Sequence, residues 1–328
     1  MNGARAIAHG WMNSIQFTEP RGSLDTLDSL LEDTVNTYLR EPLVESKPKT
    51  RDRAKRSGKA DRARYCNSKL DFMPTWNPNL YLQFANERTR PSLDLIARIA
   101  ISNPQRIIDL GCGPGNSTEM LRQRWSKADI TGLDSSPEMI AAASKAYPEA
   151  KWVLADVATW TADATFDIVF SNATLHWVPN HATLFAHLLE QVTPNGVLAV
   201  QMPTHFHSPV HQLMYEIADD PAWQNLMHKA KNTLVNEKPS FYYDVLQPKA
   251  SRIDIWETEY HHVMDSHESI LQWISGTSLR LFLEALESSE QKHQFQEMLL
   301  AGVRGAYPRQ KDDRVLFPFR RLFIIAYR

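Results

Sequence analysis

The most constraining stretch of this sequence is an apolar run that stops at a loop with glycine at every second position. Residues 106–110 carry the β-branched and apolar side chains of an inner parallel strand. Gly111, Gly113 and Gly115 follow, and glycine permits positive φ angles and close approach of a ligand to the backbone. Residues 116–119 then offer a capping residue and an acidic first turn for a helix. This order predicts a nucleotide-binding α/β unit.

The spacing of the glycines narrows the class of nucleotide. A dinucleotide-binding loop reads G-x-G-x-x-G, whereas this loop reads G-x-G-x-G, with Asp109 two residues before the first glycine. No Lys-Ser or Lys-Thr pair follows the loop, which excludes a phosphate-binding P-loop. Residues 109–115 instead resemble the first motif of the class I S-adenosylmethionine-dependent methyltransferases. That resemblance implies S-adenosyl-L-methionine as the cofactor.

Two further acids end the next two predicted strands. Asp134 closes the apolar run 130–134, and in nucleotide-binding α/β units an acid at this place accepts hydrogen bonds from the ribose hydroxyls. Asp156 closes the run 151–156, and the methyltransferase resemblance implies that it lies beside the adenine amino group. Helix capping would account for either acid alone. Two in succession after this loop favour ligand binding.

The rest of the chain continues the alternation of strands and helices. Apolar patterns predict strands in 166–172, 193–202, 252–264 and 321–327, and a helix over 181–191. We therefore predict an α/β fold with a Rossmann-like, seven-stranded, mostly parallel sheet and helices on both faces. The resemblance implies that the last strand is antiparallel, and the helical patterns after the fifth strand predict a helical lid insertion. Ligands in such sheets bind at the carboxyl edge of the strands.

Residues 1–72 differ in composition from the rest of the chain. The segment 47–64 holds nine lysines or arginines against two aspartates and no aromatic residue, so it cannot repay its ordering entropy by burial. We expect a largely disordered extension with one amphipathic helix over 24–39. A solvated linker is one interpretation, and the other is a tail for nucleic acid or an acidic partner, or a localisation signal. The methyltransferase domain is expected over 73–328, with a helical cap at about 205–250 and 265–306.

Composition limits the partners and the compartment. The net charge of −2 gives no overall attraction to nucleic acid, and no run of 18 apolar residues exists to span a membrane. Only Cys66 and Cys112 are present, which suits a reducing compartment. Because no signal-peptide core is found at the N-terminus, we expect a cytoplasmic protein, either a monomer or a weak homodimer. Cys112 is expected to serve as a small residue in the loop.

From residue 73 onward the chain resembles one particular family. The motif Trp-Asn-Pro at 76–78, the Thr-Gly and Asp-Ser-Ser-Pro pairings at 131–137, and Val-Gln-Met-Pro at 200–203 carry this resemblance. The family is that of the trans-aconitate 2-methyltransferases. The resemblance implies that a carboxylate of trans-aconitate, a small tricarboxylate, is esterified with the methyl group of S-adenosylmethionine. Residues 1–72 have no counterpart in that family.

The expected site follows from these motifs. The cofactor contacts are assigned to Asp109, Gly111, Cys112, Gly113, Gly115, Asp134, Ser135, Asp156, Val157 and Asn172. A carboxylate is already ionised at neutral pH, so no general base is expected. Tyr81, Arg88 and Arg280 are expected to position the acceptor, with the arginines on its non-reacting carboxylates. Further contacts are assigned to Tyr242, Tyr243 and His205.

Two histidine-containing segments could have functions other than acceptor binding. His205, His207 and His211 have a spacing that could bind a metal, but prolines interrupt the segment and no acid accompanies it, so we expect no metal. At the same place the family more often has Asp-Asn-Trp, which leaves the identity of the acceptor open. His176 and Trp177 follow the fourth predicted strand, and we expect them to pack with some cofactor contact.

Three alternatives to the expected activity remain. The acceptor could be another small carboxylic acid or a hydroxyl compound. The basic segment could dock a nucleic acid as the methylated polymer. The chain could also bind S-adenosylmethionine without turnover.

Overall fold

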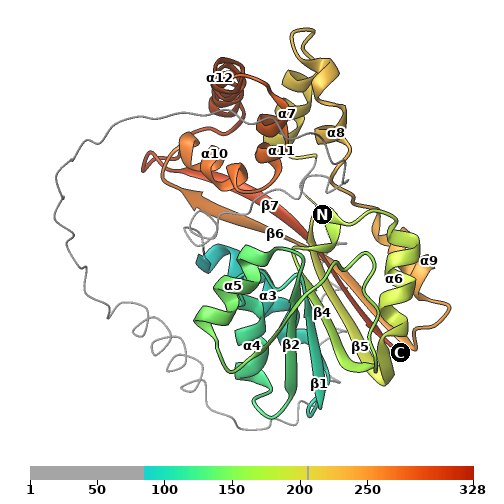
Figure 1. Ribbon diagram of the computed structural model, residues 1–328. Helices are drawn as coiled ribbons and strands as arrows, with labels where there is room; N and C mark the ends of the chain where they lie inside the picture. The colour runs from blue at the N-terminus through green and yellow to red at the C-terminus, as the bar shows by residue number, and fades with distance from the viewer. Residues whose placement is uncertain (1–84, 205–206) are drawn as a thin grey trace, which may run out of the picture. The chain divides into compact units, whose positions relative to one another are not determined.

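The central sheet has seven strands in the order β3-β2-β1-β4-β5-β7-β6. It is seen in a computed structural model that describes residues 85–204 and 207–328, with the side chains described from Thr89 onward (Figure 1). These residues all belong to one compact unit of the chain. The strands are β1 Arg106–Leu110, β2 Asp129–Asp134, β3 Lys151–Leu154, β4 Phe166–Asn172, β5 Val192–Pro203, β6 Arg252–Met264 and β7 Val315–Tyr327.

The pairing of the strands confirms the predicted fold class. Strands β1 to β5 pair in parallel, and β7 is antiparallel to both of its neighbours, β5 and β6. The strand order reverses between β1 and β4, which is where open α/β sheets bind their ligands. The two largest differences from the predicted boundaries are that β3 ends at Leu154, before Asp156, and that β7 begins at Val315 rather than at Arg321.

Helices cover both faces of the sheet. Helices α3 Ala85–Arg98 and α4 Asn116–Arg124 pack on the face that carries Ile107, Phe170 and Phe323. Helices α6 His181–Glu190 and α9 Pro239–Leu246 pack on the opposite face. Residues 239–246 fall in the range expected for the cap, yet Tyr242 and Leu246 bring α9 onto the sheet because both side chains are fully buried there.

A second apolar core lies among the inserted helices. It joins α7 Pro209–Ala218, α10 His267–Ser275, α11 Ser278–Ala285 and α12 Ser289–Ala306 to the ends of β6 and β7 that extend beyond the parallel strands (Figure 1). Trp273, Phe282 and Phe295 are almost completely buried in it. The short elements α5 Pro137–Ala146, η1 Leu175–Trp177, η2 Gln224–Leu226 and α8 His228–Lys231 complete the described chain.

Several sequence expectations lie outside the described residues. They concern the amphipathic helix at 24–39, the basic segment at 47–64 and the start of the methyltransferase domain at 73. Among the helices that the structure describes, none combines the length and apolar character that crossing a bilayer requires.

Candidate functional site

The loop after β1 folds back on the end of β2. The backbone N–H groups of Gly111 and Cys112 donate to the carbonyl of Leu133, at 2.7 and 2.9 Å. Gly111, Gly113 and Gly115 all have positive φ, at 71°, 56° and 96°. The loop therefore has a conformation that side chains with a Cβ rarely adopt.

The three glycines meet different requirements. A Cβ at Gly111 would lie 2.1 Å from the Thr174 side chain, and one at Gly115 would lie 2.8 Å from the Trp152 ring. At Gly113 a Cβ would meet nothing within 4 Å, so this residue faces open space. Gly111 and Gly115 thus permit close packing of protein against protein. Gly113 leaves bare backbone exposed to whatever occupies the cavity.

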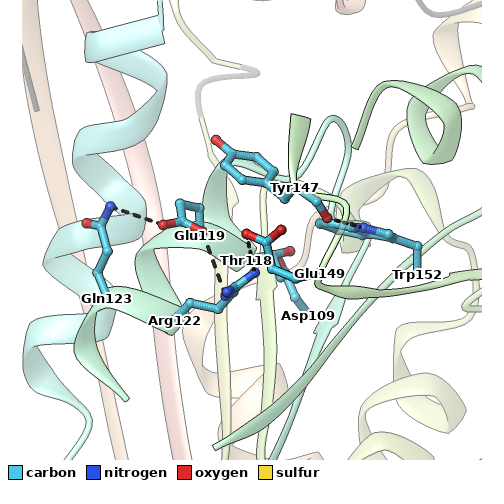
Figure 2. Close-up of polar contacts among 8 residues, drawn as sticks. All are labelled: Asp109, Thr118, Glu119, Arg122, Gln123, Tyr147, Glu149 and Trp152. Carbon is cyan, nitrogen blue, oxygen red and sulfur yellow. Dashed lines mark hydrogen bonds and ion pairs between the residues drawn. The ribbon is translucent and has the colours of Figure 1, made fainter. Parts of the chain in front are cut away.

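Asp109 is a buried acid that organises the loop from behind. Its Oδ2 accepts hydrogen bonds from Ser117 Oγ at 2.6 Å and from Thr118 Oγ1 at 2.7 Å, and Figure 2 shows Thr118 beside it. Burial raises the pKa of Asp109 to about 6, although these two hydrogen bonds act in the opposite direction. The start of α4 was expected to have a capping side chain, but its N-cap is Gly115, which has none. The hydroxyls of the first turn bind Asp109 instead.

The same first turn is tied to the neighbouring loop on its outer side. Arg122 lies between Glu119 and Glu149, at 3.9 and 3.8 Å, and the Trp152 indole N–H donates to the Tyr147 carbonyl at 3.1 Å (Figure 2). The Trp152 ring fills the space beside Gly115 and Gly132. These contacts hold α4 against the chain that follows α5.

Asp134 joins the glycine loop to the next helix. Its Oδ2 accepts from the backbone N–H of Gly113 at 2.9 Å, and its Oδ1 accepts from that of Ser136 at 2.9 Å. Burial raises the pKa of this carboxyl, and the two backbone donors oppose that shift. Ser136 caps α5 through a hydrogen bond from Met139 N, and Pro137 is the first residue of the helix.

Asp156 lies in a turn just past the end of β3. Its side chain is exposed, and its Oδ1 accepts from the backbone N–H of Ala158 at 2.9 Å. The next residue, Val157, is buried. The acid therefore organises its own turn rather than capping a helix, and it also borders the cavity described next.

One cavity of about 350 Å³ brings most of the expected cofactor residues together, and this is within the usual range for small-molecule sites. The residues of the expected set that line it are Gly111, Cys112, Gly113, Asp134, Ser135, Asp156, Val157 and Asn172. Asp109 and Gly115 do not line it, because the first acts through Ser117 and the second packs on aromatic rings.

Other lining residues were not found from the sequence. They include Thr89 and Ser92 of α3, Thr233, and Leu281 of α11. No local motif marks Thr89, Ser92, Thr233 or Leu281. Trp177 was singled out by its position after the fourth strand, and it does border the cavity beside the buried ring of His176.

The expected acceptor residues have different surroundings. Arg280 lies on α11 next to Leu281, with 13% of its side chain exposed and Glu284 3.9 Å away. Tyr242 is fully buried on the sheet face opposite α3, where its hydroxyl contacts His181 Nδ1 at 2.7 Å and accepts from Glu237 N. The structure thus corrects the expectation for Tyr242, because this hydroxyl is part of the core. Tyr243 is 52% exposed and does not border the cavity.

Three acceptor expectations fall where side chains are not described. Tyr81 and His205 lie outside the described residues, and of Arg88 only the backbone, in α3, is described. His211 is buried between Ser208 Oγ and Ser278 Oγ, each 3.0 Å from a ring nitrogen. Among residues 85–204 and 207–328, no three His, Cys, Asp or Glu side chains gather as metal ligands would.

Comparison with known proteins identifies the class. A family model described as a methyltransferase domain matches residues 108–200, which span β1 to β5. The trans-aconitate 2-methyltransferase of Escherichia coli O45:K1 is 45% identical over 259 residues, which cover 78% of this chain and 99% of that protein. The enzyme of the same name from E. coli O157:H7 is 44% identical over the same length. The solved structure of the YcgJ protein from Bacillus subtilis matches with a TM-score of 0.49 and 14% identity, covering 73% of this chain and 98% of that chain.

The strand order and the matched domain define a class I methyltransferase that uses S-adenosyl-L-methionine. Within that class, the chain belongs to the trans-aconitate 2-methyltransferase family. The family resemblance described from the sequence is therefore confirmed.

Proposed function

We propose that this enzyme transfers a methyl group from S-adenosylmethionine to one carboxylate of trans-aconitate, giving the monomethyl ester. The observation that carries the proposal is the relationship to enzymes of that name, which extends over 99% of their length and so includes the inserted helices as well as the sheet. Those helices contribute Leu281 to the cavity wall.

The residues of the cavity fit the cofactor. Asp134 is placed to accept hydrogen bonds from the ribose hydroxyls, since its carboxylate is held at the cavity edge by Gly113 N and Ser136 N. Asp156 and Val157 border the same cavity and are assigned to the adenine. The bare backbone at Gly113 leaves room for the amino-acid part. When bound, the cofactor supplies a methyl group on a positively charged sulfur.

The acceptor requires orientation rather than proton removal. A carboxylic acid with a pKa near 4 is ionised at neutral pH, so its oxygen can attack without a general base. The protein must hold the acceptor so that the attacking oxygen approaches the methyl carbon in line with the breaking bond. We assign Arg280 to a non-reacting carboxylate, because a bidentate clamp on the attacking oxygen would reduce its nucleophilicity. Arg88, Tyr81 and His205 keep their sequence-based assignment to the acceptor.

Transfer of a radiolabelled methyl group tests the proposal. The full chain is incubated with labelled S-adenosylmethionine and a panel of di- and tricarboxylates, with RNA in a parallel reaction. We expect an ester of trans-aconitate to form faster than any other product, as resolved by chromatography and confirmed by alkaline hydrolysis. Methylation of another acid, or of RNA, in preference to trans-aconitate would refute the assignment. If no methylated product forms, the remaining interpretation is that the protein binds S-adenosylmethionine without transferring its methyl group.

A further inference from the structure

The buried face of α3 changes character where the helix reaches the cavity. Further along the helix this face is apolar, and Leu95, Ile96 and Ile99 pack into the core. Ser92 lies one turn before Leu95 and Ile96 on the same face, lines the cavity and is only 1% exposed. A hydroxyl therefore occupies a position where the pattern of the helix favours an apolar side chain.

The Ser92 hydroxyl has no hydrogen-bond partner among the residues that the structure describes. A serine within a helix can satisfy its hydroxyl by donating to the carbonyl four residues earlier, but Ser92 does not do so. An unpaired buried hydroxyl is unfavourable, and alanine at this position would avoid that cost. Because the hydroxyl borders the cavity, a bound ligand can supply the missing partner.

The first turn of α4 borders the same cavity. Asn116 and Ser117 line it, and α3 packs against α4. The first amide of α4 to meet a backbone acceptor is that of Glu119, which donates to the Gly115 carbonyl at 3.0 Å. The amides of residues 116–118 precede it and have no carbonyl within the helix to bind, and Gly115 has no side chain to cap them. We call Ser92 and residues 116–118 the α3–α4 corner.

The side chains of the first turn are engaged elsewhere. The hydroxyls of Ser117 and Thr118 donate to Asp109, and Glu119 pairs with Arg122 on the outer side of the helix. The N-terminal end of α4 is thus left to a ligand. Helix N-termini carry partial positive charge and bind anions through their N–H groups. Backbone donors and a buried hydroxyl together suit a carboxylate, which accepts several hydrogen bonds at once.

The methyl donor and the acceptor both carry carboxylates, and the charges near the corner favour the donor. Asp109 accepts from Ser117, and Asp134 accepts from the backbone N–H of Gly113 at 2.9 Å, so two acids lie close by. They disfavour an acceptor that carries only negative charge. The amino-acid part of S-adenosylmethionine has an ammonium group next to its carboxylate, so the acids suit one group and the corner suits the other.

We propose that Ser92 and the first turn of α4 bind the carboxylate of the amino-acid part of S-adenosylmethionine. The inference rests on the proposed function for the position of that part beside Gly113, and it adds the groups that recognise its negative charge. Ser92 is then a specificity-determining residue for the methyl donor, contributed by a helix outside the glycine-loop motif. The site should discriminate against adenosyl compounds that lack this carboxylate.

Two ligands separate the carboxylate from the rest of the donor. They are S-adenosylhomocysteine and its decarboxylated form, which keeps the amino group. Isothermal titration of the full chain should show the affinity of Ser92→Ala for S-adenosylhomocysteine about tenfold below that of the wild type, as expected for loss of a hydrogen bond to a charged group. The affinity for the decarboxylated ligand should be unchanged. Ser144→Ala is the matched control, since Ser144 is an exposed serine of α5 that does not border the cavity, and it should bind both ligands like the wild type.

The melting temperature separates recognition from a structural role. Because Ser92 Oγ has no partner in the described part of the chain, ligand-free Ser92→Ala should melt at the wild-type temperature or above it. Saturating S-adenosylhomocysteine should raise the melting temperature of the variant less than that of the wild type, since stabilisation by a ligand follows its affinity. A ligand-free variant that melts well below the wild type would show that the hydroxyl supports the fold, and would overturn its assignment to the ligand.

Asn116→Asp tests the helix end independently and decides the matter if Ser92→Ala does not fold. The new carboxylate has nearly the size of the amide and is favourable for the helix in its first turn. It should lower the affinity for S-adenosylhomocysteine by repulsion of the ligand carboxylate. The decarboxylated ligand, whose remaining charge is positive, should bind this variant at least as tightly as it binds the wild type. Equal losses for both ligands would refute the recognition of a carboxylate.

The outcomes also separate this inference from the proposed function. If the ligands and variants behave as expected but no acid is methylated, the proposed function fails and the corner stands. If trans-aconitate is methylated but Ser92→Ala binds S-adenosylhomocysteine like the wild type, the corner is refuted as a donor site. A raised KM for trans-aconitate in that variant would then assign it to the acceptor. If the wild type does not bind S-adenosylhomocysteine, both proposals are refuted.

Discussion

The two sides of the cavity are built in different ways. On the glycine-loop side, the lining comes from the ends of three strands, β1, β2 and β3, and much of it is backbone held by Asp109 and Asp134. On the other side, the lining comes from Thr89, Thr233 and Leu281, which are far apart in the sequence. The first side is determined by local chain geometry, whereas the second depends on how distant segments of the chain pack.

This difference indicates which side of the cavity determines cofactor binding and which side determines acceptor specificity. A glycine at positive φ and an acid at a strand end have the same effect in any sheet of this topology, so one side suits an invariant cofactor. Side chains contributed by separate segments outside the sheet can be exchanged without disturbing it. The second side can therefore be adapted to a particular acceptor.

The largest expected effect tests the glycine-loop side. Asp134→Ala removes the acceptor of the Gly113 and Ser136 N–H groups as well as the proposed ribose contact. We expect the affinity for S-adenosylhomocysteine to fall about 100-fold, measured by isothermal titration calorimetry. Asp129→Ala is the matched control, since Asp129 begins the same strand, is exposed, and pairs only with Lys151 among the contacts described. Equal affinity in both variants would contradict the ribose assignment.

The next effect concerns the buried acid behind the loop. The pKa of Asp109 is raised from 3.8 to about 6 by burial, so between these values the unfolded chain loses its proton while the folded chain keeps it. Stability contributed by the protonated form is therefore lost as the pH rises through this window. Compared with Asp109→Asn, the wild type should lose about 2 kcal/mol of unfolding free energy between pH 4 and pH 7.

Urea denaturation at the two pH values measures this difference. Asp265→Asn serves as the control, because the side chain of Asp265 is 91% exposed. If the wild type and Asp109→Asn show the same pH dependence, Asp109 is not the acid that opposes folding at neutral pH.

A smaller effect tests the acceptor side. Arg280→Ala should raise the KM for trans-aconitate about tenfold, because a charged hydrogen bond to a carboxylate would be lost from a partly exposed site. The affinity for S-adenosylhomocysteine should not change, because Arg280 is assigned to the acceptor side and not to the cofactor side of the cavity. Arg304→Ala, on the exposed surface of α12, is the control. An unchanged KM would remove Arg280 from the acceptor site.

The smallest effect concerns Tyr242. Tyr242→Phe should lower the free energy of unfolding by about 1 kcal/mol, through loss of the bonds to His181 and Glu237 N. The KM for the acceptor should stay the same, since the hydroxyl lies in the core. Chemical denaturation and steady-state kinetics measure the two quantities. A raised KM with normal stability would restore the sequence-based assignment.

Much of the fold could be predicted because its signals are local. The limits of β1, β4 and β6 agree with the apolar patterns in the sequence. The end of β3 was placed two residues too late, because Asp156 forms a turn with Ala158 rather than a strand position.

The residues of the acceptor side were harder to predict from the sequence, because tertiary packing determines which of them are buried. Tyr242 and Tyr243 are neighbours on one helix, yet one is buried and the other is 52% exposed, so residue type alone could not assign their roles. Arg321 was predicted only to begin the last strand, and no role was predicted for its side chain. Its burial beside Gln201 follows from the antiparallel pairing of β5 with β7, which joins positions that are far apart in the sequence.

The cysteine within the glycine loop has a consequence for the durability of the enzyme. Cys112 borders the cavity yet is only 3% exposed, and burial, reinforced by Asp109 and Asp134, raises the pKa of its thiol well above the usual range. Sulfonium compounds are alkylating agents, and the thiolate is the form of cysteine that they modify. A buried thiol that stays protonated is a poor nucleophile, so this position in the loop should resist alkylation by the methyl donor.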